Sequence, residues 1–291
     1  MERIDFRDQI SGNKRKSFFL MIFIAIFIII LGYAISFAFD PGYFFVVMII
    51  AVIISLFYIW GGYYNSDKIA ISSVKAKPAD RIKHHDFYRL AEGLIIASGI
   101  PMPKLYVMES PSINAFASGR DPKHAIVCVT TGALEKLERR ELEGVLAHEM
   151  GHIANYDIRF ITLVTVMVGI ISIISQIFLR SLWFKSGGEN NKGSLIFIII
   201  GIVLAILAPI VVTLVQLAIS RKREYTADAT AVKFTRNPYG LIGALEKIKK
   251  ENVPEKKISK ALAPMFFTNP LKGLTSTHPP LEKRIEVLKK M

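Results

Sequence analysis

Four long runs of apolar residues constrain what this chain of 291 residues can fold into. The first two, residues 17–39 and 43–62, contain no charged side chain and are separated only by an Asp-Pro-Gly turn at residues 40–42. With a rise of about 1.5 Å per residue, a helix of either length crosses a hydrocarbon layer of about 30 Å. A cleaved signal sequence would be shorter and would not be followed at once by a second run. We therefore expect a transmembrane hairpin over residues 17–63.

The third and fourth runs, residues 160–179 and 194–220, are also free of charged side chains but are less uniformly apolar. Gln176 lies in the third run, and Pro209 lies in the fourth. Long helices buried in the protein are therefore an alternative to membrane spans. The length of the runs favours spans, so we expect a second transmembrane hairpin over residues 160–220.

Lys and Arg are distributed unevenly around these runs. They are concentrated before the first run, after the second and after the fourth, whereas the opposite side receives only the turn at residues 40–42 and the weakly charged loop at residues 180–193. Because short loops rich in Lys and Arg stay in the cytoplasm, we expect the N-terminus and both long polar segments to be cytosolic. The expected divisions of the chain are residues 1–16, 17–63, 64–159, 160–220 and 221–291.

The net charge of +13 is consistent with a lipid bilayer as a partner. No nucleic-acid partner is expected, because the Lys and Arg residues lie beside the apolar runs and no recognition motif for nucleic acid accompanies them. The one cysteine, Cys128, excludes both an intrachain disulfide and a metal site built from several thiolates. Any metal must therefore be held by histidines and carboxylates.

Periodicity in the polar segments predicts several helices and a small sheet. Apolar residues recur at helical spacing over residues 80–100, and short strands are expected at residues 104–109 and 125–131. Further helical patterns cover residues 141–152, 221–234, 239–250 and 281–290. The expected fold class is a mostly α membrane protein, with four transmembrane helices in two hairpins and a cytosolic α+β domain that contains a small β-sheet.

One of these expected helices carries the HExxH pattern, as His148-Glu-Met-Gly-His152. Residues four apart lie on one helix face, so His148 and His152 can direct their imidazoles at a common ion, while Glu149 flanks them without binding it. Such a site holds zinc through two histidines, a third protein ligand and an open position for water. Glu149 would be the base that takes a proton from the attacking water. The alternative is a helix face with two solvated histidines.

The motif does not fix the third ligand. A metzincin would have a glycine and a third histidine where this chain has Asn155 and Ile158, so that class is excluded. The ligand must lie on the same side of the membrane as His148, and Glu224, just after the fourth run, fits this requirement best. Asp228 lies one turn further along the same face and could accept a proton from a ligating histidine. On spacing alone, a solvated acidic face explains the pair equally well.

Four motifs follow one another along the chain: Asn114-Ala-Phe-Ala117, His148-Glu-Met-Gly-His-Ile-Ala-Asn155, Arg221-Lys-Arg-Glu-Tyr-Thr-Ala-Asp228 and Ser276-Thr-His-Pro279. Together they resemble the HtpX family of membrane zinc endopeptidases, to which the CAAX prenyl protease is more distantly related. The resemblance covers nearly the whole chain, including the order of the apolar runs. It implies a gluzincin-like metalloprotease domain on the cytosolic side.

The resemblance implies one zinc ion (Zn2+) per chain, held by His148, His152 and Glu224. Glu149 would be the catalytic base, and Asp228 would support a ligating histidine.

The resemblance also implies residues that face the substrate. Asn114, Ala115 and Phe116 would belong to an edge strand that pairs with an extended substrate, and His278 would stabilise the oxyanion. The alternatives are an ordinary turn and strand at Asn114 and a helix-start histidine at His278.

The implied activity is hydrolysis of peptide bonds in misfolded or damaged membrane and membrane-proximal proteins. This would be a quality-control and stress-response role, with the enzyme in the cell membrane and its active site on the cytoplasmic side. A site-2-type intramembrane protease also uses HExxH, but it would need a Leu-Asp-Gly motif that this sequence lacks, and residues 136–143 are too polar for a bilayer centre. A non-enzymatic zinc scaffold would have no need of a base at Glu149.

Other polar residues have less specific interpretations. Asp157 could orient the site, but capping of the third apolar helix is slightly favoured. The resemblance suggests that Arg284 pairs with an acidic residue of the site, and a solvated Arg284 is the alternative. His84, His85 and His124 are expected at the surface rather than as ligands.

Overall fold

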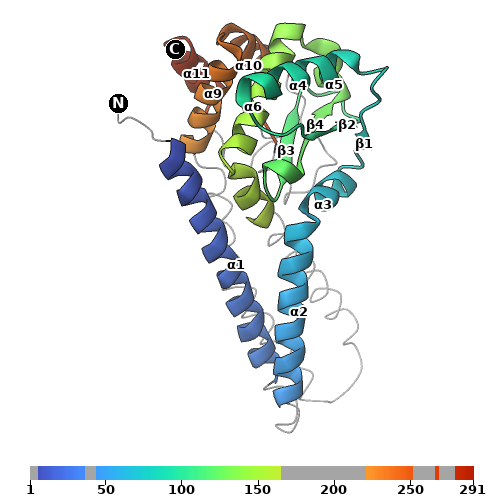
Figure 1. Cartoon of the computed structure of the whole chain (residues 1–291), viewed down its shortest axis with the longest axis vertical. Helices are drawn as coiled ribbons and strands as arrows, with labels where there is room; N and C mark the ends of the chain where they lie inside the picture. The colour runs from blue at the N-terminus through green and yellow to red at the C-terminus, as the bar shows by residue number, and fades with distance from the viewer. Residues whose placement is uncertain (1–5, 37–43, 165–220, 252–265, 269–278) are drawn as a thin grey trace.

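A computed structural model describes residues 6–36, 44–164, 221–251, 266–268 and 279–291. Two long helices, α1 (Phe6–Ser36) and α2 (Phe44–Tyr64), form a stem below a globular α+β domain (Figure 1). The expected oxyanion residue His278 and most of the expected second hairpin, residues 165–220, lie outside the described residues.

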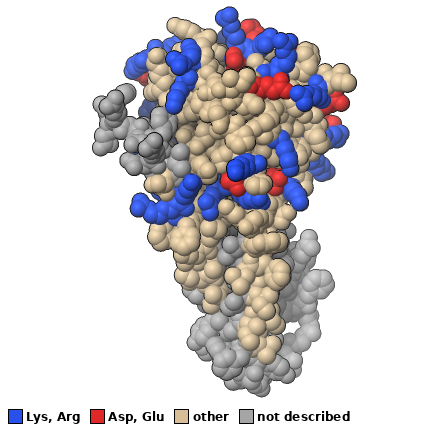
Figure 2. Space-filling view, in the orientation of Figure 1, with Lys and Arg blue, Asp and Glu red and all other residues tan. Residues whose placement is uncertain are grey.

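The stem contains the first two apolar runs. Its helices contact each other, and several of their apolar side chains are exposed, including Phe57 at 70% and Phe19 at 60%. Figure 2 shows Lys and Arg side chains over the globular domain and at the top of the stem, but none on the visible side of the lower stem. By length and hydropathy, none of the helices in the described part of the chain qualifies as a membrane-crossing segment. The four expected transmembrane helices are therefore not confirmed.

A four-stranded mixed sheet lies within the globular domain, with strand order β1-β2-β4-β3. The strands are β1 (Lys77–Pro78), β2 (Lys104–Met108), β3 (Ala115–Gly119) and β4 (Ala125–Thr130). Strands β2 and β4 are parallel, and the other two pairs are antiparallel. The two expected strands are confirmed as β2 and β4. Strand β3 lies at the edge of the sheet, as the family resemblance implied for this segment.

Helix α6 (Arg139–Ala154) runs through the centre of the domain and carries the HExxH pattern (Figure 1). A capping box begins it, in which the backbone N–H of Glu138 donates to the Glu141 carboxylate at 2.7 Å. Leu146, Ala147 and Met150 are fully buried where α6 contacts the sheet and its neighbouring helices. The other α-helices of the described residues are α3 (Ser66–Ser73), α4 (His85–Ser98), α5 (Thr131–Lys136), α9 (Arg221–Thr235), α10 (Tyr239–Glu251) and α11 (Leu281–Leu288).

Candidate metal centre

The two histidines of α6 face each other in the interior of the domain. Their Nε2 atoms are 3.1 Å apart, and the relative exposure of the residues is 0% for His148 and 7% for His152. Their rings meet nearly at right angles, with centroids 4.7 Å apart. The spacing of four residues therefore places both imidazoles on one face of the helix, as expected, and directs the same ring nitrogen of each at a shared position.

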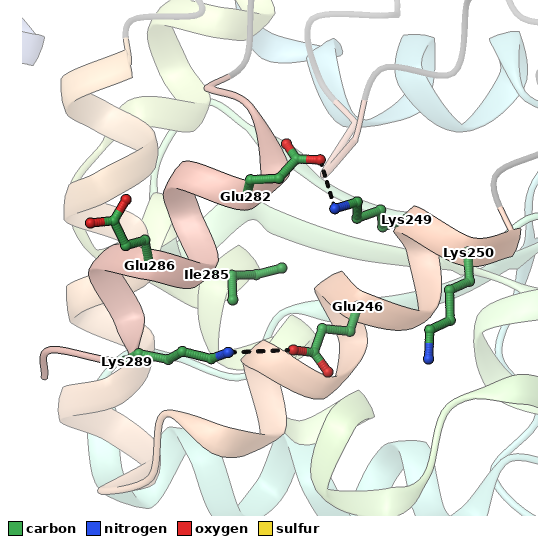
Figure 3. A pocket seen from close by; sticks show the side chains of 7 residues that line it. All are labelled: Glu246, Lys249, Lys250, Glu282, Ile285, Glu286 and Lys289. Atoms are coloured by element: carbon green, nitrogen blue, oxygen red, sulfur yellow. Dashed lines mark ion pairs between the residues drawn. The ribbon is translucent and has the colours of Figure 1, made fainter.

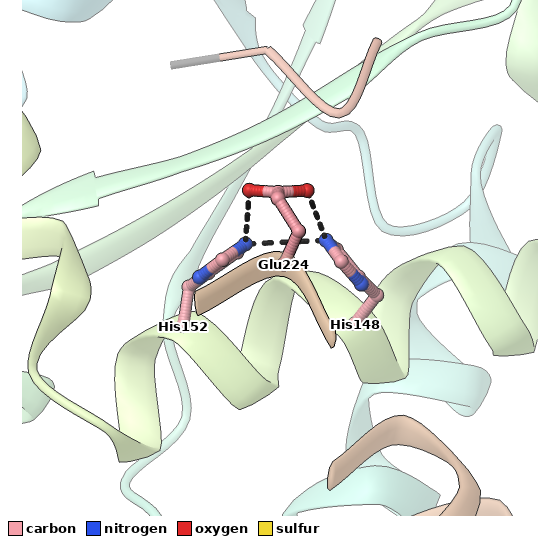
Figure 4. A group of neighbouring side chains, drawn as sticks. All are labelled: His148, His152 and Glu224. Atoms are coloured by element: carbon pink, nitrogen blue, oxygen red, sulfur yellow. Dashed lines mark hydrogen bonds and ion pairs between the residues drawn. The ribbon is translucent and has the colours of Figure 1, made fainter. Parts of the chain in front are cut away.

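Glu224 reaches this position from α9, a helix that lies against α6 (Figure 4). One carboxylate oxygen lies 3.7 Å from His148 Nε2, and the other lies 3.7 Å from His152 Nε2. The three donor atoms all lie within 4.8 Å of one another. Gly151 allows the close approach of α9, because a Cβ at this position would lie 3.2 Å from the Thr230 Cβ. The structure thus brings together the three residues named from the sequence.

Each histidine also has a carboxylate partner on its other ring nitrogen. Asp228 Oδ1 lies 2.9 Å from His148 Nδ1, and Asp157 Oδ2 lies 3.0 Å from His152 Nδ1. Because a carboxylate accepts, each neutral imidazole carries its proton on Nδ1 and presents a lone pair at Nε2. Two ring nitrogens that face each other at 3.1 Å with a carboxylate beside them suit a cation. Two imidazole nitrogens and one carboxylate oxygen are a donor set that zinc prefers.

The proximity of Asp157 to His152 supports the less favoured of the two roles considered for this residue. Asp157 is the first helical residue after the turn that follows α6, and its side chain is fully buried and hydrogen-bonds a histidine of the centre. The turn between α6 and the following helical residues brings the carboxylate back toward the imidazole.

Arg284 adds a buried positive charge beside the centre. It donates to both oxygens of Asp228 at 2.6 and 2.9 Å, and its Nη1 lies 3.6 Å from the Glu224 carboxylate. Although burial opposes ionisation, Arg284 and the hydrogen bond with His148 hold the pKa of Asp228 well below its usual range. The sequence left solvation of Arg284 open, and the structure shows instead a buried residue that fixes Asp228.

The two histidines differ in their affinity for a proton. Burial lowers the pKa of His148 to about 4, an effect that its hydrogen bond with Asp228 only partly offsets. Burial also disfavours the charged form of His152, but the hydrogen bond with Asp157 and the charge of Glu224 raise its pKa to about 9. The surroundings of His152 thus favour one positive charge, which a bound metal cation would supply.

Glu149 lies on the side of α6 that faces a small cavity. The cavity is lined by Ala117, Glu149, His152, Ile158, Ile161, Glu224, Phe266 and Phe267, and its volume of about 10 Å³ is close to that of one water molecule. Glu149 Oε1 is buried and has no hydrogen-bond partner among the described residues. Burial raises the pKa of this carboxyl to about 7. A protonatable group therefore lines the same cavity as His152 and Glu224.

The edge strand β3 is already partly paired with a segment that the sequence did not identify. The backbone N–H of Phe267 donates to the Ala115 carbonyl at 2.8 Å, and Phe116 forms an antiparallel bridge with Phe266. The Asn114 side chain donates to the Thr268 carbonyl at 3.0 Å and accepts from the Thr268 N–H at 3.2 Å. In this structure, the expected substrate-binding residues therefore contact the chain's own residues 266–268.

A second hollow lies between α10 and α11, away from the metal centre (Figure 3). Ion pairs cross it, from Lys249 to Glu282 at 2.9 Å and from Lys289 to Glu246 at 3.8 Å. These side chains are largely exposed and balance one another, so the hollow has the character of a solvated surface.

Comparison with known proteins agrees with the geometry of the metal centre. Residues 81–291 match the model of peptidase family M48. The chain belongs to peptidase family M48. Membership makes it a protease, and together with the His-His-Glu group it makes the chain a metalloprotease.

M48 relatives match nearly the whole chain. A Protease HtpX homolog from Caldanaerobacter subterraneus subsp. tengcongensis is 44% identical over 289 residues, which cover 97% of this chain and 96% of the relative. A Protease HtpX homolog from Dictyoglomus thermophilum is 43% identical over 295 residues, which cover 100% of this chain and 96% of the relative. The HtpX resemblance inferred from the motifs is confirmed.

A solved structure supports the fold. The crystal structure of S. mikatae Ste24p matches with a TM-score of 0.53 and 19% sequence identity, over 97% of this chain and 66% of that chain. This chain therefore spans about two thirds of the length of Ste24p and shares its fold.

Proposed function

We propose that this protein is an integral membrane zinc endopeptidase whose zinc is held by His148, His152 and Glu224. One observation carries the proposal: two imidazole nitrogens and a carboxylate converge on one position, while both opposite ring nitrogens are paired with carboxylates. A bound zinc ion would polarise a peptide carbonyl and activate water as a nucleophile. Asp228 and Asp157 would hold each imidazole in the tautomer that directs Nε2 at the ion.

Glu149 is the proposed general base. It takes a proton from water as the water attacks the peptide carbonyl, and it then delivers this proton to the leaving nitrogen. Its unbonded Oε1 at the cavity supports this role. His278 is the proposed oxyanion donor of the same reaction.

The proposed substrate is an extended peptide that pairs with the edge of β3 at Asn114, Ala115 and Phe116. Because residues 266–268 pair with this edge, a substrate strand has to displace them in order to pair with Ala115 and Phe116. Ala117 lines the cavity together with Glu149, so a peptide bound along this edge would pass the proposed base.

The proposed setting is the cell membrane, with the catalytic site on the cytoplasmic side. The uncharged apolar runs and the placement of Lys and Arg around them support this setting. The proposed substrates are misfolded or damaged membrane and membrane-proximal proteins, whose unfolded segments supply extended backbone. Such cleavage would serve quality control under stress.

Cleavage of a denatured membrane protein by the purified full-length enzyme tests this function. We expect zinc-dependent cleavage by the unaltered enzyme. The Glu149→Gln variant should bind zinc with unchanged stoichiometry and cleave at least about 1,000-fold more slowly, because it keeps the ligands but has no base. Unchanged cleavage by Glu149→Gln would exclude Glu149 as the base. Zinc binding without cleavage by the unaltered protein would favour the alternative of a zinc-stabilised scaffold.

A further inference from the structure

The N-terminal end of α1 contacts the globular domain through one helix face. Asn13, Ser17 and Leu20 are buried on that face at the spacing of an α-helix, with relative exposures of 4%, 0% and 3%. The charged residues between them, at positions 14–16, are exposed. A buried asparagine on a helix otherwise rich in apolar residues requires hydrogen-bond partners, and these partners show what the contact does.

The partners of Asn13 lie at both ends of the turn that follows α6. Its side-chain amide donates to the Asn155 carbonyl at 2.9 Å and to Asp157 Oδ1 at 2.7 Å, across sequence separations of 142 and 144 residues. Asp157 uses its other oxygen, Oδ2, to accept from His152 Nδ1 at 3.0 Å. A continuous series of hydrogen bonds therefore joins the first helix to a histidine of the metal centre.

The turn that Asn13 bridges has an unfavourable backbone conformation. Tyr156, between the two partners of Asn13, has a φ of 59°, in the left-handed region that residues with a Cβ rarely adopt. This conformation returns the chain so that Asp157 faces His152. Lys14 lies over the Tyr156 ring, with its Nζ 4.3 Å from the ring centroid. Two adjacent residues of α1 thus contact all three residues of the turn.

We propose that Asn13 is a positioning residue of the metal centre, which acts by fixing the Asp157 carboxylate against His152. With Oδ1 bound to Asn13 and Oδ2 bound to His152, the Asp157 carboxylate cannot rotate without breaking one of these two hydrogen bonds. Partners beyond the ligands control the orientation and metal affinity of a ligating histidine. The first helix thereby supports a ligand of the metal centre through Asp157. This inference rests on the proposed zinc site.

A double-mutant cycle on the full-length protein in detergent tests the proposal, with zinc affinity measured by competition with a chelator. Removal of the carboxylate in Asp157→Ala should weaken zinc binding by about 10- to 100-fold. Asn13→Ala should weaken it by about 3- to 10-fold, because it acts one hydrogen bond further away. In the Asp157→Ala background, Asn13→Ala should cause no further loss, since the two residues act in series.

Two control variants distinguish positioning of the Asp157 carboxylate from general attachment of α1 to the globular domain. Ser17→Ala alters a residue that is equally buried but donates only to the Asn13 carbonyl of its own helix. Lys14→Met removes the contact with Tyr156 and leaves the hydrogen bonds to Asp157 in place. Both variants should retain unaltered zinc affinity. Visible absorption of the cobalt-substituted protein gives a second measurement, in which Asn13→Ala should shift the bands in the same direction as Asp157→Ala.

Three results would overturn the proposal: unchanged zinc affinity in Asn13→Ala, an equal loss in Lys14→Met, or an undiminished effect of Asn13→Ala in the Asp157→Ala background. Thermal unfolding of each variant shows whether it is folded, and a misfolded Asn13→Ala is replaced in the cycle by Asn13→Ser. Absence of zinc from the unaltered protein would instead refute the proposed function.

Discussion

Arg284 donates two hydrogen bonds to Asp228, at 2.6 and 2.9 Å, and both side chains are completely buried. The pair joins α11 to α9 and places the Asp228 carboxylate against His148. Arg284 thus stabilises the fold and positions a partner of a proposed zinc ligand.

Replacement of Arg284 by Met should lower the free energy of unfolding by about 3–5 kcal/mol, because it leaves the Asp228 charge buried without its main partner. Urea denaturation measures the effect. Lys249→Met is the matched control, since Lys249 pairs with Glu282 at 2.9 Å but both side chains are more than half exposed. The control should change stability by less than about 1 kcal/mol. Equal effects of the two substitutions would contradict the structural role of Arg284.

Gly144 permits the contact between α6 and α10. A Cβ at this position would lie 2.5 Å from the backbone nitrogen of Leu241, so Gly144→Ala requires α10 to shift. We expect a loss of about 1–3 kcal/mol in the free energy of unfolding. Gly93→Ala in α4 should instead stabilise the protein by about 0.5–1 kcal/mol, because its Cβ meets no atom within 4 Å beyond the backbone of its own helix and alanine favours the helix. Thermal unfolding of both variants tests whether Gly144→Ala lowers the stability and Gly93→Ala raises it.

Asn114 should control how firmly residues 266–268 are held on the edge of β3. Asn114→Ala removes both hydrogen bonds to Thr268, so local opening there should become easier by about 1–3 kcal/mol. The amide of Phe267, which is bonded to Ala115, should then exchange with solvent faster, while amides in β4 serve as an internal control. An unchanged exchange rate at Phe267 would show that Asn114 does not hold this segment.

Removal of zinc should destabilise the protein, because the ion binds the folded state at donors that converge only there. At a free zinc concentration of about 1,000 times Kd, the bound ion contributes about 4 kcal/mol. We expect a chelator to lower the Tm and added zinc to restore it. Glu149→Gln retains the three ligands and should show the same dependence. A Tm that does not respond to zinc in either protein would argue against a preformed site.

The sequence was sufficient to predict which side chains share a helix face, because helical periodicity alone decides this. A spacing of four residues places His148 and His152 on one helix face, and the same argument places Asp228 beside Glu224 on α9. That Glu224 is the partner of both histidines required the family resemblance, because helical spacing does not report which helices pack together.

Some contacts could not be predicted from the sequence, because they depend on backbone conformation or on long-range packing that leaves no local sequence pattern. Asp157 faces His152 because Tyr156 adopts a left-handed conformation, which neither residue type nor spacing indicates. Asn13 lies 144 residues from Asp157, and no helical or strand periodicity relates the two. The pairing of Phe267 with Ala115 likewise joins distant parts of the chain, so only tertiary structure shows it.

Zinc K-edge X-ray absorption on the full-length protein tests the central claim most directly. We predict one zinc per chain, bound by two imidazole nitrogens at about 2.0–2.1 Å and a carboxylate oxygen at about 2.0–2.2 Å. Glu224→Ala should lose the carboxylate and bind zinc much more weakly. A zinc environment that is the same with and without the Glu224 side chain, or one that lacks two imidazoles, would contradict the assignment of His148, His152 and Glu224.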